Sequence, residues 1–361
     1  MTSKQRQQAG YGSQLIQVSG DLVLGPTESR VAEIARAQAR LVVEEFATEA
    51  QETASTRIEN LDNRVIGELD KLGLLNVFSD PAFLLLLKKT QLHAAATGSD
   101  ADHDILSKLL TERAQDPSKP MHMVVTRAVE VIEQIDDQAL LGMTCLWFVA
   151  TVIPNAYDPL EGLAYFDKLA LHLGAGELPS SAGWLQRLDL MGCISYQPPG
   201  LQSLKKWHQI LMATRPGYVC EGVSSDHELY IRQRLSEIHP ELPTWLVAHC
   251  FNPGHFRLNA GSSQIFLDLT RQSVAQIGKL DELESVVAEC KVDSANEVVA
   301  KSAGQYVQSN LPNLEYIRQW WDGIEGAMRI TPLGVAIAYS NAKRFDPLLG
   351  LGSLRSMLAS G

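Results

Sequence analysis

The stretch from Asp80 to Pro154 decides the fold, because its apolar residues recur at helical spacing through three consecutive segments. These segments are DPAFLLLLKKTQLHAAATG (80–98), DADHDILSKLLTERAQ (100–115) and MHMVVTRAVEVIEQIDDQALLGMTCLWFVATVIP (121–154). We expect the third segment to break near Ile135-Asp136-Asp137. Its second part is apolar on all sides, which is typical of a helix at the centre of a bundle. The sequence therefore predicts a helical core here.

A long helix is predicted upstream of this core, from Glu28 to about Leu72. Thr27 can cap its first turn, and Pro26 blocks its extension toward the N-terminus. At about 1.5 Å per residue the helix would be about 65 Å long, which exceeds what a compact domain needs. We therefore expect it to pack along another long helix or along a second copy of itself. The alternative is two ordinary helices with a kink between Thr53 and Thr56.

Two short strands are predicted before the long helix, in SQLIQVSGDLVLGP (13–26). An isolated hairpin is marginal in water, so this one needs either the body of the protein or another subunit as a partner. We expect the hairpin and the apolar positions of the long helix to assemble subunits. The candidate oligomerisation residues are Leu15, Ile16, Val18, Leu22, Val31, Ile34, Ala37, Leu41, Phe46, Ala50, Ala54 and Ile58.

The segments LDLMGCISY (188–196) and RITPLGVAIA (329–338) look like two halves of one winged-helix unit. In the first, a helix ends at Gly192 and a strand follows. In the second, a strand runs into Thr331, a natural helix cap, and Pro332 stands at the first helical position. The residues between the two halves look helical, so they form an insertion within the unit.

Together these patterns predict a mainly α fold with a short N-terminal β-hairpin. The predicted parts are a disordered start with the hairpin leader (1–26), a long amphipathic helix (27–79), a helical core (80–178), a winged-helix-like domain (179–345) with a helical insertion at about 200–318, and a tail (346–361).

Composition limits the classes of function. The net charge of −11 argues against broad nucleic-acid binding, which relies on a surplus of Lys and Arg. The winged-helix unit offers only Arg187 and Arg329 as nucleic-acid candidates. Five cysteines without framework spacing, after a polar N-terminus, indicate a reducing cytoplasm. The most apolar run, Ala139 to Ile153, is shorter than the roughly 18 residues that a membrane-spanning helix needs. We therefore expect no membrane span, and contact with a membrane surface is the alternative.

Conventional catalytic motifs are missing from the sequence: it has no GxSxG, HExxH, P-loop or GxGxxG after a strand. We therefore expect no enzyme activity and no cofactor. The weak zinc candidates are Cys220, His227, Cys250 and His255, with His249 beside them, but only Cys250 and His255 form a loose pair. A Cys250 nucleophile with His249 or His255 is a further weak alternative.

A calcium loop is another weak alternative, at Asp100, Asp102 and Asp104. The positions that require Gly and Glu carry Ile105 and Thr111 instead. These acids are more typical of a linker that caps and charges the N-terminus of a helix.

The segments at 80–115 and AVEVIEQIDDQALLGMTCLWFV (128–149) resemble the helical core of the Abi-alpha group, bacterial proteins associated with abortive infection by phage. LDLMGCISY and RITPLGVAIA are similar to that group's split winged-helix-like end, although the long insertion departs from its simpler pattern. The resemblance rests on packing motifs and carries no catalytic residues. It implies a cytoplasmic antiviral-defence protein that forms homo-oligomers and contacts a protein partner or a phage-derived trigger. The alternatives are a membrane-acting effector and an acidic winged-helix DNA-binding regulator.

Overall fold

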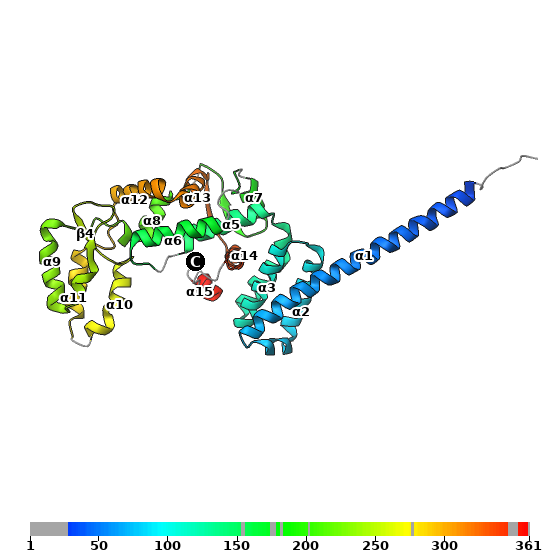
Figure 1. Cartoon of the computed structure of the whole chain (residues 1–361), viewed down its shortest axis with the longest axis horizontal. Coiled ribbons are helices and arrows are strands. Elements are labelled where there is room, and N and C mark those ends of the chain that lie inside the picture. Colours follow the sequence, from blue (N-terminus) through cyan, green and yellow to red (C-terminus); the bar gives the residue numbers. More distant parts are fainter. Residues whose placement is uncertain are drawn as a thin grey trace, which may run out of the picture. The chain divides into compact units, whose positions relative to one another are not determined.

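The computed structural model describes residues 28–152, 156–173, 178–180, 183–200, 203–275, 278–345 and 353–359. The chain divides into two compact units, Met1–Thr56 and Arg57–Gly361. The structure is mainly helical, as the sequence predicts (Figure 1). The predicted N-terminal hairpin lies outside the described residues.

The helical core is built from the predicted segments. Its helices are α1 (Glu28–Lys71), α2 (Pro81–Ala96), α3 (Asp100–Gln115), α4 (Lys119–Val131) and α5 (Asp137–Thr151). Two short 3₁₀ helices, η1 (Leu75–Ser79) and η2 (Ile132–Gln134), join them, and η2 marks the predicted break in the third segment. The helix α1 runs without a break, so the prediction of one long helix is confirmed and the two-helix alternative is wrong.

The helix starts follow from the local sequence. The side chains of Asp80, Ser99, Ser118 and Asp136 each accept a hydrogen bond from a backbone N–H in the first turn of the next helix. Such caps satisfy donors that have no partner within the helix. The Ser and Asp positions in the sequence therefore predict where α2 to α5 begin.

The larger unit contains further helical segments. They are α6 (Pro159–His172), α7 (Gly183–Leu190), α8 (Trp207–Thr214), α9 (Ser225–Ile238), α10 (Ser263–Ala275), α11 (Leu280–Glu289), α12 (Glu297–Asn310), α13 (Pro312–Gly323), α14 (Pro332–Ala342) and α15 (Leu354–Ala359), with the 3₁₀ helices η4 (Pro216–Tyr218) and η5 (Leu242–Trp245).

Two central helices organise the larger unit. The first, α5, is buried from Ala139 to Val149 except at Leu141, in agreement with its apolar sequence. The second, α14, is buried along most of its length and packs against α3, α4 and α5. Buried Asn341 of α14 donates a hydrogen bond from Nδ2 to Thr144 Oγ1 of α5, at 2.8 Å, which satisfies polar groups inside the core.

A two-stranded antiparallel sheet joins distant parts of the chain. Its strands are β1 (Ile194–Gln197) and β5 (Ala327–Ile330), with Ile194 opposite Ile330 and Ser195 opposite Arg329. Gly334 lets α14 approach this sheet closely, because a methyl group there would lie 2.1 Å from the Cys193 carbonyl oxygen. The sequence correctly placed a strand in each half. The assignment of a winged helix stays a prediction.

The insertion contains a second hydrophobic core. This core lies between Val223 and Val292 and is formed by α9, α10, α11 and a three-stranded sheet (Figure 1). The strands β2 (Val223–Ser224), β4 (His255–Leu258) and β3 (Leu246–Ala248) pair antiparallel in that order. The insertion is mainly helical, as expected, but the prediction did not include these three strands. Strands of two to four residues are too short to show a period of two in the sequence.

Candidate interaction surfaces

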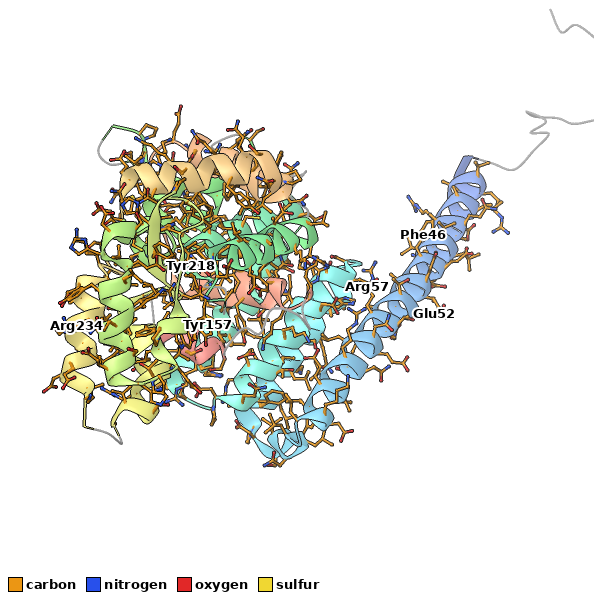
Figure 2. The ribbon with its side chains drawn as sticks, turned by 60° about the vertical axis from the view of Figure 1, so that its left-hand side comes forward. Phe46, Glu52, Arg57, Tyr157, Tyr218 and Arg234 are labelled. Atoms are coloured by element: carbon orange, nitrogen blue, oxygen red, sulfur yellow. The ribbon has the colours of Figure 1, made fainter. Side chains whose placement is uncertain are left out.

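The first part of α1 exposes large apolar side chains. Every residue from Ser29 to Thr53 is exposed, and Leu41 and Phe46 are 65% and 64% accessible to solvent. Figure 2 shows Phe46 and Glu52 on this helix. Scattered apolar residues on a surface need no explanation, but a helix surface with several of them indicates a contact site. We refer to residues 28–56 as the α1 arm.

The candidate oligomerisation residues divide into three sets. Those of the predicted hairpin lie outside the described residues, namely Leu15, Ile16, Val18 and Leu22. Those that the structure exposes on the α1 arm are Val31, Ile34, Ala37, Leu41, Phe46 and Ala50. Ala54 and Ile58 are half-buried.

One face of the α1 arm is continuous. At about 100° per residue, Ala39, Val42, Val43, Phe46 and Ala50 lie within roughly a quarter to a third of the helix circumference. This spacing of three and four residues is the pattern by which one helix packs along another. Neither Val42 nor Val43 is among the predicted oligomerisation residues, although both are exposed. We refer to this set as the Phe46 face.

A groove lies between α2 and α4 in the larger unit. Its volume is about 420 Å³. Leu85 and Leu92, which are 69% and 64% exposed, form its apolar wall. The full lining is Ala82, Leu85, Leu86, Lys88, Lys89, Leu92, His122 and Thr126. Lys89 already forms an ion pair of 2.7 Å with Glu130, so only part of the basic rim is available for a partner.

The four zinc candidates do not form a site. Within the described residues no group of three or more His, Cys, Asp or Glu side chains could hold a metal ion. Buried Cys220 directs its Sγ to the Gly217 carbonyl at 3.6 Å, and His227 Nδ1 lies 3.5 Å from Ser224 Oγ. Cys250 and His255 stand at the two ends of the turn that precedes β4. Their closeness in sequence does not create a set of metal ligands.

Neighbouring His249 is held neutral by its surroundings. Its Nδ1 accepts the Phe251 backbone N–H at 3.2 Å, so Nε2 carries the proton and donates to the Cys220 carbonyl at 2.9 Å. Burial lowers the pKa of His249 to about 4. Partial desolvation by the surrounding protein raises the pKa of the Cys250 thiol to about 11, although the residue remains exposed to solvent. A nucleophilic cysteine needs a lowered pKa, so the geometry disfavours the Cys250–His249 pair.

The two nucleic-acid candidates are not equivalent. Arg187 donates from Nη2 to Asp136 Oδ2 at 2.6 Å, which neutralises its charge locally. The pKa of Asp136 is lowered, first by the Ala139 backbone N–H that it caps. Arg329 is exposed on β5. Within the described part of the chain no ion pair is found for Arg329, and one such cation is a thin positive footprint for a phosphate backbone.

The aspartates considered for calcium have other partners. Asp100 and Asp104 form ion pairs with Arg64 at 2.6 and 2.7 Å, and Asp102 accepts a hydrogen bond from Thr97 Oγ1 at 2.8 Å. The helix α3 is capped by Ser99 and begins at Asp100 itself. Asp100 and Asp102 therefore belong to the first turn of the helix, where negative charge is favourable, and Asp104 lies in the next turn rather than in a preceding linker.

Sequence reasoning missed two buried arginines that fasten the insertion to the core. Arg257 of β4 donates to three backbone carbonyls, those of Gly217 (2.9 Å), Ala260 (2.9 Å) and Tyr157 (3.2 Å). Arg215 donates to the Val152 carbonyl and stacks over the Phe166 ring, 4.6 Å from its centre. Tyr157 and Tyr218, which belong to this region, are labelled in Figure 2. Arg215 and Arg257 bind backbone carbonyls and not acidic side chains. Every residue has a carbonyl, so the sequence contains no pattern that predicts these contacts.

The chain matches a known protein family over most of its length. One family model, described only by the suffix “-like”, matches residues 25–351. The chain belongs to this family. No curated protein and no solved structure matches it. Both the α1 arm and the insertion lie within the range that the family model covers, so both are part of the family's sequence pattern.

The length and hydropathy of the helices bear on whether the chain could cross a membrane. None of the helices in the described parts of the chain is both long and apolar enough to cross a bilayer. The predicted candidate, Ala139 to Ile153, forms the buried helix α5 over most of its length.

Proposed function

We propose that this protein works through protein–protein contacts and that it self-associates through the α1 arm. One observation carries the proposal: Leu41, Val42, Val43 and Phe46 are all exposed on a single helix. Removing such side chains from water contributes about 1.5–3 kcal/mol each when burial is complete. A second copy of the same helix is the simplest partner, because closed symmetric assemblies reuse one surface on both subunits.

The predicted hairpin is part of the same proposal. Its strands precede the α1 arm in the sequence, and they would add backbone pairing to the side-chain contacts of the helix. The unit made of α7, β1, β5 and α14 would then serve as a winged-helix-like packing module. Antiparallel pairing of β1 with β5 supports that reading, and the ion pair between Arg187 and Asp136 favours packing over duplex binding.

Mass measurement in solution tests the self-association. In the full chain, Val42→Gln with Phe46→Gln removes apolar area but retains good helix formers. We expect the association constant to fall at least about tenfold, as measured by sedimentation equilibrium. The matched control is Leu85→Gln with Leu92→Gln, which changes equally exposed leucines of the larger unit. The proposal fails if the wild-type chain is monomeric, or if the control weakens assembly as much as the α1 variant.

The cellular role that we propose is antiviral defence in the bacterial cytoplasm, and it rests on the resemblance to the Abi-alpha group. An assembly that contacts a phage-derived trigger needs exposed contact surfaces, which the α1 arm and the groove between α2 and α4 provide. Phage plaquing on a lawn that expresses the gene tests this role. A loss of plaques that disappears with the Val42/Phe46 variant would support it, whereas equal plaquing with and without the gene across varied phages would oppose it.

A further inference from the structure

Charge is distributed unevenly along the α1 arm. Its first part, up to Arg40, has three arginines (Arg30, Arg36 and Arg40) against two glutamates. Its second part, from Leu41 to Thr56, has four glutamates and no basic residue. Glu52 of the second part is labelled in Figure 2. The two parts therefore carry opposite net charge, although both are exposed on one helix.

This asymmetry distinguishes the two ways of pairing the helix with its copy. In a parallel pair, Glu44, Glu45, Glu49 and Glu52 of both copies would lie side by side within about one Debye length, which is unfavourable. In an antiparallel pair, the arginine part of each copy lies beside the glutamate part of the other. Electrostatic complementarity of this kind fixes orientation and register.

The apolar residues define a matching register. If the twofold axis passes between Val42 and Val43, each Phe46 lies opposite Ala39 of the other copy. Ala50 then lies opposite Ala35, and the two valines meet at the centre. All of these positions are exposed on the α1 arm. Pairing a large side chain with a small one lets facing helices interdigitate, so the antiparallel direction makes the Phe46 face self-complementary.

We propose that two copies of the chain pair through antiparallel α1 arms, centred between Val42 and Val43. The inference rests on the proposed self-association and adds its geometry. Each Phe46 ring packs over the small side chain of Ala39 of the other copy. Arg36 and Arg40 of one copy neutralise the glutamates that follow Leu41 in the other.

Pulsed electron–electron resonance on the full chain tests the direction. A nitroxide is attached at Gln38→Cys or at Gln51→Cys, two exposed positions whose replacement leaves the charge unchanged. Both variants are made with Cys250→Ser, because Cys250 is the exposed cysteine and the other four are buried. In the proposed register, Gln51 lies opposite Ile34, so the two Gln51 labels are about 26 Å apart along the axis. The two Gln38 labels are about 14 Å apart along the axis.

The outcomes separate the two proposals. A longer distance for Gln51 than for Gln38 is the expected result. Short distances at both positions mean a parallel pair and overturn the antiparallel inference while self-association stands. Absence of dipolar coupling together with a monomeric mass overturns self-association itself. The unlabelled Cys250→Ser chain must keep the wild-type mass, which shows that the background substitution is harmless.

Discussion

The two parts of α1 have apolar residues at similar spacing, but these residues are buried in one part and exposed in the other. Between Arg57 and Lys71, Leu61, Val65 and Leu69 are buried in the main core of the larger unit. In the α1 arm, Val31, Leu41 and Phe46 are exposed. Periodicity therefore shows that a helix has an apolar side, but not whether its own chain covers that side. Exposure separates residues that stabilise the monomer from residues that are available to a partner.

The largest expected effect is a difference in stability between the two parts. Leu61→Ala deletes a side chain with 0% exposure and is expected to cost about 2–5 kcal/mol in free energy of unfolding. Leu41→Ala in the α1 arm is expected to change it by less than about 0.5 kcal/mol. Urea denaturation at a concentration below the onset of association measures both. Equal losses for the two variants would mean that Leu41 is buried in the monomer, and the comparison would be wrong.

The next effect is a pH dependence that is confined to the larger unit. Burial lowers the pKa of His249 from 6.5 to about 4, so the folded state binds its proton less readily than the unfolded state. The stability from neutral His249 is fully present above about pH 6.5 and is lost as the pH falls toward 4. The full loss, once the pH is below both pKa values, is on the order of 3 kcal/mol. Urea denaturation between pH 7 and pH 4.5 measures it.

A matched variant isolates this effect. His249→Gln keeps a donor and an acceptor at the site but does not titrate, so its stability should fall less steeply with acid. The α1 arm contains no histidine, so association should be constant between pH 7 and pH 5.5. A wild-type slope that persists in His249→Gln would assign the pH dependence to other groups.

Much of the fold was predictable from local signals, and the exceptions have physical reasons. Asp80, Ser99, Ser118 and Asp136 mark helix starts because capping acts within one turn. The short strands β2, β3 and β4 could not be predicted, because their pairing depends on residues far apart in the chain.

The candidate surfaces were predictable only in part. Spacing alone predicts Phe46 and Leu41 as contact residues, and the structure shows that both are exposed. The exposure of Val42 and Val43, and the groove beside Leu85 and Leu92, required the packed structure. The weak zinc candidates do not come together within the described residues, because proximity of Cys250 and His255 in the sequence does not fix where further ligands lie.

The smallest expected effect concerns the charges of the α1 arm. Arg40→Glu places a fifth negative charge beside the four glutamates of an antiparallel partner and should weaken association about two- to fivefold, the usual worth of exposed charge pairs. Adding Glu44→Arg restores the balance of charge across the pair, so the double variant should recover most of the loss. Sedimentation at 0.05 M and 1 M salt measures both variants, and the differences should vanish at high salt because the charges are screened. If Arg40→Glu alone strengthens association, the basic part of one copy does not face the acidic part of the other.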